Sequence, residues 1–242
     1  MSIVVFTDID DTLIQTERKC PQGEPLAVTA VDKQGAPASF STPAQQCFFD
    51  WSAAQHLIPV TGRNKQALDR VALNFTSYKV IDHGAIVLDQ NDLPDPQWMD
   101  AIRAQSERWQ GILQDYLARV AQQIETQKLS LRCRIISDYE VPCYISIKGE
   151  PGDLLKLKTL GEDFAALEDN ARVHVNGNNM ALLAPYSCKK RAVEFIQQRL
   201  VERERAVLFI GAGDSSSDLP FMQACHFQVI PSTSQITREQ LQ

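Results

Sequence analysis

The sequence predicts an α/β fold in which a doubly wound parallel sheet is interrupted by a separate α+β module. Apolar runs at residues 3–6, 57–60 and 206–210 have the continuous apolar character of strands that are buried on both faces. Helical segments separate these runs, an alternation typical of a parallel sheet. Between residues 86 and 183 the pattern changes to strands of alternating polarity, which indicates an inserted antiparallel module.

The first half of the predicted core begins with the strand at residues 3–6. A hairpin or flap follows, with strands at 26–31 and 38–41. Ser41-Thr42-Pro43 predicts the start of a helix that runs to about residue 55, because a hydroxyl caps the helix and proline suits its first turn. The remaining elements are the strand at 57–60, a helix with Leu68, Val71 and Ala72 on one face, and a strand at 79–82.

The predicted module, residues 86–183, contains a long helical stripe from Trp109 to Ile124. Its other elements are strands at 131–136 and 144–148, a helix at 154–164, and two strands around the turn Asn176-Gly177-Asn178-Asn179. From Lys189 the first pattern returns, with a helix, the strand at 206–210 and a last strand near 227–230. We therefore expect a discontinuous core of residues 1–85 and 184–242.

The composition excludes several classes of protein. A net charge of −6 argues against a nucleic-acid or membrane surface as the main partner, since either would favour a basic stripe. No apolar run approaches the ~20 residues that span a bilayer, and the chain starts directly with a core strand, so we expect a cytoplasmic protein, monomeric or homodimeric. The six cysteines have no Cys-x-x-Cys spacing, which favours free thiols over a zinc or redox site.

An acidic cluster directly follows the first strand, in Thr7-Asp8-Ile9-Asp10-Asp11-Thr12. Two carboxylates ~4 Å apart at an effective dielectric of ~20 repel each other by about 4 kcal/mol, so the cluster favours a bound cation. A second cluster, Gly213-Asp214-Ser215-Ser216-Ser217-Asp218, follows the strand at 206–210. If a helix begins in this loop, Asp214 and Asp218 share one of its faces. For this pair alone, an equally good interpretation is that Asp218 caps a helix and Asp214 lies in a turn.

The two clusters together predict a metal site, because the ends of strands in one parallel sheet point the same way. Asp8, Asp10 and Asp214 supply the hard oxygen ligands that Mg²⁺ prefers. Thr61-Gly62-Arg63 follows another strand and adds a hydroxyl, a close backbone approach and a cation, and Lys189 begins a helix. Taken singly, Thr61 is better interpreted as a helix cap and Lys189 as a solvated lysine. Together they predict a site for a dianionic phosphoryl group.

In these residues the chain resembles the haloacid dehalogenase-like superfamily. Its four motifs are matched in order by Asp-x-Asp-x-Thr at Asp8–Thr12, the strand-end Thr61, the helix-start Lys189, and Gly-Asp-x-x-x-Asp at Gly213–Asp218. The spacing is similar to that of the Cof-type branch and its sucrose-phosphatase and mannosyl-3-phosphoglycerate-phosphatase relatives. These proteins insert a large α/β cap between the second and third motifs, so the resemblance implies a Rossmann-like core with residues 86–183 as the cap.

The resemblance also implies a role for each matched residue. Asp8 is the nucleophile that forms an aspartyl phosphate, and Asp10 is the general acid and base. Asp8, the backbone carbonyl of Asp10 and Asp214 hold Mg²⁺, with Asp218 as a ligand or a supporting group. Thr61, Gly62 and Lys189 bind the phosphoryl oxygens; Lys190 remains an alternative to Lys189.

Two departures from the family pattern lie next to these motifs. Asp11 occupies a position where relatives often have glycine, and we expect it to shape the loop. His83-Gly84 replaces the usual Asn-Gly where the core leaves for the cap, and we expect a structural role for His83.

The alternation of the cap strands puts Arg132, Arg134 and Lys148 on polar faces, together with His174. We expect this platform and Arg63 to bind a substrate with polar or anionic groups beyond its phosphate, such as a phosphorylated sugar; a solvated strand face is the equally weighted alternative. The predicted activity is that of a Mg²⁺-dependent phosphatase acting on a small phosphorylated metabolite. A phosphomutase of the same superfamily and a non-catalytic phospholigand-binding protein are the rival interpretations.

Overall fold

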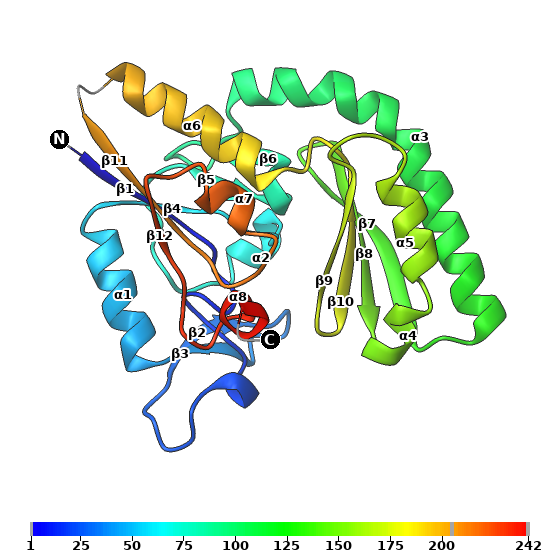
Figure 1. Ribbon diagram of the computed structural model, residues 1–242, viewed down its shortest axis with the longest axis horizontal. Coiled ribbons are helices and arrows are strands. Elements are labelled where there is room, and N and C mark those ends of the chain that lie inside the picture. Colours follow the sequence, from blue (N-terminus) through cyan, green and yellow to red (C-terminus); the bar gives the residue numbers. More distant parts are fainter. Residues whose placement is uncertain (1, 204–205, 241–242) are drawn as a thin grey trace. The chain divides into compact units, whose positions relative to one another are not determined.

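The computed structural model describes residues 2–203 and 206–240, and its chain divides into two compact units. Unit 1 comprises residues 1–93 and 189–242, and unit 2 comprises residues 94–188 (Figure 1). The expected start of the inserted module at residue 86 lies too early, because strand β6 (Ile86–Leu88) pairs with β5 (Lys79–Ile81) inside unit 1. No helix of the described residues combines the length and the apolar character needed to cross a membrane.

Unit 1 is built on a four-stranded parallel sheet, which confirms the predicted fold class. Its strand order is β12-β11-β1-β4, and β1 is central, with β11 and β4 parallel on either side. Figure 1 shows helices α1 and α6 on opposite sides of this sheet. The strands are β1 (Ser2–Thr7), β4 (His56–Pro59), β11 (Val207–Ala212) and β12 (Phe227–Val229), and the main helices are α1 (Pro43–Ala53) and α6 (Lys189–Arg203).

The start of α1 agrees with the predicted capping. The Thr42 hydroxyl accepts a hydrogen bond from the backbone N–H of Gln45, and the Gln45 side chain accepts one from the N–H of Thr42. This reciprocal capping box satisfies two N–H groups that a helix end leaves without partners. The hairpin β2 (Ala27–Val31) and β3 (Pro37–Ser41) before it is antiparallel, also as predicted.

The helix predicted around Leu68, Val71 and Ala72 is shorter than expected. Helix α2 (Lys65–Leu68) ends before Val71, which forms a bridge with Ala30 of the hairpin. The backbone N–H of Ala72 donates to the carbonyl of Thr29. The backbone bonds that would extend the helix are thus made to the hairpin, a non-local contact that helical periodicity does not reveal.

Unit 2 is the predicted α+β module. Its antiparallel sheet has the order β7-β8-β10-β9, and α3 and α5 pack against one side of it (Figure 1). The single helix predicted at 154–164 is two helices, interrupted at Lys156–Leu157. The elements are α3 (Pro96–Gln127), β7 (Leu131–Asp138), β8 (Val141–Gly149), α4 (Pro151–Leu155), α5 (Lys158–Ala165), β9 (Arg172–Asn176) and β10 (Asn179–Leu183).

The shorter elements of unit 1 complete the fold. A 3-10 turn, η1 (Glu17–Lys19), precedes the hairpin, and a second, η2 (Asp82–Gly84), connects β5 to β6. Helices α7 (Leu219–Met222) and α8 (Gln235–Gln240) follow β11 and β12; α8 has no counterpart among the expected elements. All six cysteines are free thiols, as expected.

Candidate active site

Two acidic loops leave the same edge of the parallel sheet. The last residues of three strands lie in one row, because Thr7 of β1 pairs with both Ala212 of β11 and Pro59 of β4. Asp8 directly follows β1, and Asp214 follows β11. The convergence predicted from strand direction is therefore present, and it comes from the parallel register of β1 with its two neighbours.

Three buried carboxylates and one lysine form the centre of this edge. Oxygen atoms of Asp8, Asp214 and Asp218 lie within 4.8 Å of one another, and these side chains belong to residues that are 6%, 4% and 0% exposed. Lys189 Nζ lies 2.7 Å from Asp8 Oδ1 and 2.7 Å from Asp218 Oδ1. One ammonium thus bridges two of the three carboxylates.

The geometry distinguishes Lys189 from Lys190. Lys189 is the first residue of α6 and is 7% exposed, whereas the Lys190 side chain is 47% exposed and lies 3.6 Å from the Glu194 carboxylate on the same helix. A cation at a helix N-terminus opposes the helix dipole, so the two carboxylates are what make this position favourable. Although burial alone would lower it, the pKa of Lys189 lies above its usual value because Asp218 and Asp8 are adjacent.

Asp218 is held from two sides. Its Oδ2 accepts hydrogen bonds from the backbone N–H of Ser215 at 3.1 Å and from the Ser215 hydroxyl at 2.6 Å, while its Oδ1 accepts from Lys189. A Cβ on Gly213 would lie only 2.6 Å from the Cβ of Asp218, so this close turn requires glycine. The helix that would put Asp214 and Asp218 on one face does not begin in this loop, because α7 begins only at Leu219; a loop turn brings the second acidic cluster together.

Asp214 has a different environment. No described residue donates a hydrogen bond to its carboxylate, although the residue is almost fully buried. Burial, together with repulsion from Asp218 and Asp11, raises the pKa of Asp214 to about 7. Burial also raises the pKa of Asp8, supported by repulsion from Asp218 and Asp214 and opposed by Lys189. A hard divalent cation fits this site, since it would supply the positive charge that one lysine does not.

The Asp10 side chain is not part of this carboxylate cluster. Its carboxylate pairs with Arg63, which donates from Nε to Oδ2 at 2.8 Å and from Nη2 to Oδ1 at 2.7 Å. Of the three residues predicted to supply oxygen ligands, Asp8 and Asp214 bring their carboxylates to this cluster and Asp10 does not. Its backbone carbonyl remains the predicted ligand.

Thr61 is not the cap of α2. Asn64 caps that helix, with its side-chain oxygen accepting from the N–H of Ala67. Thr61 is 1% exposed, and its hydroxyl accepts a hydrogen bond from the N–H of Arg63 at 3.1 Å. A Cβ on Gly62 would lie 2.4 Å from the His83 ring, so glycine is required here by a close approach within the protein.

Sequence reasoning missed Lys19, which lies in η1 and forms an ion pair with Asp11. Asp11 has a φ of 63°, a left-handed conformation that glycine and aspartate tolerate better than most residues. Lys19 opposes the rise in the pKa of Asp214, so its charge acts at the acidic cluster. No spacing in the sequence relates Lys19 to the motifs, because the flap segment that carries it has no regular pattern.

In unit 2 the register confirms that the basic residues share a face of the sheet. Arg132 lies opposite Lys148, and Arg134 lies opposite Ser146. The same face continues across β10 to His174 and Arg172 of β9. The opposite face carries buried apolar side chains, among them Ile145, Ile147 and Leu182. We call the first face, with Arg132, Arg134, Lys148, Arg172 and His174, the basic face.

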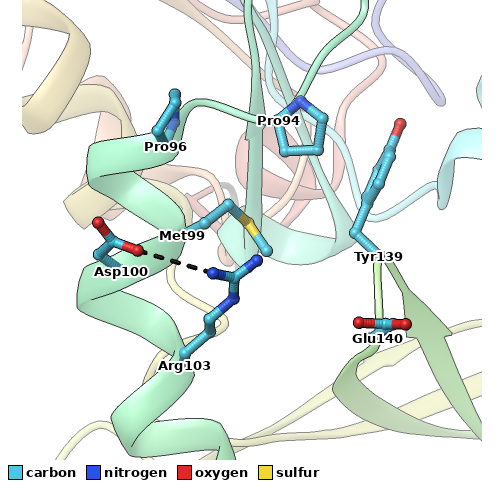
Figure 2. A pocket seen from close by; sticks show the side chains of 7 residues that line it. All are labelled: Pro94, Pro96, Met99, Asp100, Arg103, Tyr139 and Glu140. Carbon is cyan, nitrogen blue, oxygen red and sulfur yellow. Dashed lines mark ion pairs between the residues drawn. The ribbon is translucent and has the colours of Figure 1, made fainter.

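Unit 2 also has an open pocket of about 430 Å³, shown in Figure 2. An ion pair between Asp100 and Arg103, 3.7 Å apart, lies along it, and both side chains are largely exposed. The other lining residues are Pro94, Pro96, Met99, Tyr139 and Glu140. None of the predicted site residues lines this pocket.

Comparison with known proteins identifies the fold. No protein-family model matches the chain, and no curated protein does. Among solved structures, the sucrose-phosphatase from Synechocystis sp. PCC6803 in complex with sucrose and phosphate is 19% identical, with a TM-score of 0.58 over 100% of this chain and 87% of that one. The C-terminal domain of C. albicans trehalose-6-phosphate phosphatase is 14% identical, with a TM-score of 0.60 over 92% and 73%.

A third similar structure is described as a member of the superfamily that the motifs resemble. A haloacid dehalogenase-like hydrolase from Bacteroides thetaiotaomicron is 10% identical, with a TM-score of 0.51 over 95% of this chain and 94% of that one. At these identities the similarity shows the fold. It is the haloacid dehalogenase-like fold that the four motifs implied.

The raised pKa of Asp214 predicts pH-dependent binding of Mg²⁺. Below about pH 7 this carboxyl is largely protonated, and it must lose its proton to coordinate a cation. We expect the Mg²⁺ association constant to fall about tenfold per pH unit below pH 7 for each proton displaced. Isothermal titration between about pH 6 and about pH 8, in buffers of different ionisation enthalpy, measures both affinity and proton release.

Two variants, one as the test and one as the control, accompany this titration. Asp214→Asn removes the carboxyl group that is predicted to bind the cation, so we expect weak Mg²⁺ binding with a reduced pH dependence. Glu194→Gln changes an exposed carboxylate that is paired with Lys190, and its titration should match the wild type. An Mg²⁺ affinity of the wild type that stays constant across this pH range would contradict the assignment of Asp214 as a ligand.

Proposed function

We propose that this chain is a Mg²⁺-dependent phosphatase that hydrolyses a small phosphorylated metabolite through an aspartyl-phosphate intermediate. One observation carries the proposal: Lys189 bridges Asp8 and Asp218, beside the buried Asp214 carboxylate that has no donor among the described residues. Burying such a cluster is destabilising unless its charges are paired or bind a ligand of opposite charge. A bound divalent cation would offset the negative charge that Lys189 leaves in this cluster, and it would also attract the oxygens of a phosphoryl group.

In the proposed reaction Asp8 is the nucleophile. Its carboxylate oxygen attacks phosphorus, the bond from phosphorus to the substrate oxygen breaks, and Asp10 gives its proton to the leaving alcohol. In the second step Asp10 takes a proton from water, the water oxygen bonds to phosphorus, and the bond from phosphorus to Asp8 breaks. Lys189 holds Asp8 at 2.7 Å, which fixes the nucleophile and limits repulsion of the incoming anion.

We assign the metal site to Asp8, the backbone carbonyl of Asp10 and Asp214, with Asp218 as a ligand or supporting group. Both Asp218 oxygens already accept hydrogen bonds, from Lys189 and Ser215, which favours the supporting role. When bound, Mg²⁺ neutralises charge on the phosphoryl oxygens. The donor-less Asp214 is the side chain with most capacity for such a cation.

We assign phosphoryl binding to Thr61, Gly62 and Lys189. Thr61 follows β4 at the same sheet edge as Asp8, and its buried hydroxyl still has a proton to donate, because the bond that it makes to Arg63 N–H uses a lone pair. Gly62 follows it directly, and we assign its backbone amide to the same phosphoryl group. Hydroxyl, amide and ammonium donors together match the oxygens of a phosphoryl group.

We assign the core role to unit 1 and the cap role to unit 2. The basic face of unit 2 supports a substrate with anionic or polar groups beyond its phosphate, such as a sugar phosphate. Three of its cations, Arg132, Arg134 and Lys148, are exposed at neighbouring positions of β7 and β8. The similarity to a sucrose-phosphatase solved with sucrose and phosphate supports the same class.

The nucleophile assignment predicts that Asp8→Asn abolishes phosphate release. A screen of phosphorylated metabolites with Mg²⁺, comparing wild type and variant, measures it by phosphate assay. Phosphate release by Asp8→Asn at the wild-type rate would overturn the covalent mechanism. Isomerised product without released phosphate, dependent on a bisphosphorylated activator, would indicate a phosphomutase. Mg²⁺ and phosphate binding by a wild type that turns over no phosphoester would indicate a non-catalytic binding protein.

The adjacent lysines provide a matched comparison. Lys189→Met removes the ammonium that contacts Asp8 and Asp218, so we expect kcat to fall ~10²–10³-fold, as when a preorganised donor is lost. Lys190→Met removes an exposed charge and should leave kcat unchanged. Circular dichroism with Mg²⁺ present verifies folding of both variants. Equal kcat values for the folded variants would contradict the role of Lys189.

The basic face predicts how substrates are selected. Charge reversal by Arg132→Glu and Arg134→Glu should raise KM for phosphorylated sugars while leaving kcat for p-nitrophenyl phosphate near the wild-type value, because the aryl ester lacks further anionic groups. Arg119→Glu, an exposed substitution on α3, is the control and should change neither. Unchanged kinetics of the double variant toward every phosphorylated sugar tested would refute the role of this face.

A further inference from the structure

Arg63 and Asp10 form a bidentate ion pair at the edge of the candidate site. Two different nitrogens of the guanidinium donate to the two different oxygens of the carboxylate, at 2.8 and 2.7 Å. The Asp10 side chain is 46% exposed, whereas that of Arg63 is 18% exposed. A parallel pair of this kind fixes the orientation of a carboxylate as well as attracting it.

The arginine is itself fixed by the loop that carries it. Its third nitrogen, Nη1, donates to the carbonyl of Ala67 at 3.3 Å, and its backbone N–H donates to the Thr61 hydroxyl. Its carbonyl accepts from the N–H of Asp82 at 2.9 Å. Burial alone would lower the pKa of Arg63, but the adjacent Asp10 carboxylate raises it. Asp10 thus favours the charged form of the arginine with which it pairs.

Most of the donors of Arg63 are therefore bonded within the protein. Three of its five guanidinium N–H groups, one on each nitrogen, donate to protein acceptors, so the ion pair with Asp10 and the bond to Ala67 fix the orientation of the guanidinium. The carboxylate keeps acceptor positions that Arg63 does not occupy. An ionised carboxylate has about four lone-pair sites, and a bidentate arginine occupies two of them.

We infer that Arg63 is a positioning residue for Asp10, rather than the substrate-binding residue that the sequence predicted. It holds the Asp10 carboxyl group in one rotamer, so that an oxygen position not bonded to Arg63 serves both proton transfers. Protonated at this position, Asp10 gives its proton to the leaving alkoxide, and the resulting carboxylate then accepts a proton there from the attacking water. The inference rests on the proposed phosphatase activity and adds the group that orients its acid and base.

The test separates the two chemical steps by leaving group. p-Nitrophenolate departs without protonation, so forming the phosphoenzyme from p-nitrophenyl phosphate does not need a positioned Asp10, whereas its hydrolysis does. For Arg63→Met we expect a burst of about one p-nitrophenol per enzyme, followed by a steady state slowed ~10²–10³-fold, with an unchanged Ki for inorganic phosphate. With glycerol 3-phosphate, whose leaving alkoxide needs a proton, the burst should disappear.

Further variants complete the design. Arg63→Lys should behave like Arg63→Met, because an ammonium cannot make the bidentate pair. Arg70→Met removes an arginine whose guanidinium donates to the Gln66 carbonyl at 2.6 Å, and this variant should leave both phases unchanged.

Each alternative result has a definite meaning. A raised KM and Ki for phosphate, with kcat unchanged, would overturn the inference and return Arg63 to substrate binding. Wild-type kinetics in Arg63→Met would also overturn it. A wild type that releases neither p-nitrophenol nor phosphate would overturn the proposed function and the inference together, and so differs from a failure of the inference alone.

Discussion

The charge balance among Asp8, Asp218 and Lys189 is the constraint on which the rest of the site depends. Buried carboxylates at these separations repel one another strongly, and an unpaired buried charge is among the most destabilising features of a protein. Lys189 offsets two of them from the first turn of α6, and Ser215 holds the second oxygen of Asp218. The register of β1 with β11, and the start of α6 at Lys189, are therefore parts of one electrostatic arrangement.

This arrangement leaves the three remaining functional groups in distinct environments. Asp214 is buried and no described residue donates a hydrogen bond to its carboxylate, which suits a cation ligand. Asp10 accepts a bidentate pair of bonds from Arg63, which suits a carboxyl group that must keep one orientation. Thr61 has a buried hydroxyl with a proton to donate. Carboxylates of the same chemical type thus have different environments, because each has a different cationic neighbour. The three acidic positions of the first loop show this most clearly, since Asp8, Asp10 and Asp11 pair with Lys189, Arg63 and Lys19 respectively.

Much of this could be predicted from the sequence because it depends on local patterns and on strand direction. Buried strands, the capping box at Thr42 and the turn at Gly177 are local features, and parallel register then brings Asp8 and Asp214 to one edge. The early end of α2 could not be predicted, because it depends on bonds to a distant hairpin. The orientation of Asp10 could not either, because it is set by Arg63, a residue 53 positions away in the chain.

The same reasoning explains why a motif identifies residue types more reliably than residue roles. Arg63 is a cation beside the Thr-Gly pair to which we assign phosphoryl binding, and from sequence its charge is most simply assigned to the substrate. In the structure each of its three guanidinium nitrogens donates to a protein acceptor, and its charge is already paired with the Asp10 carboxylate. A cation that makes a bidentate pair with a carboxylate can orient that carboxylate, whereas a cation without such a pair can take a ligand as its counter-ion. Role therefore follows from which donors and acceptors remain unused, and that count requires coordinates.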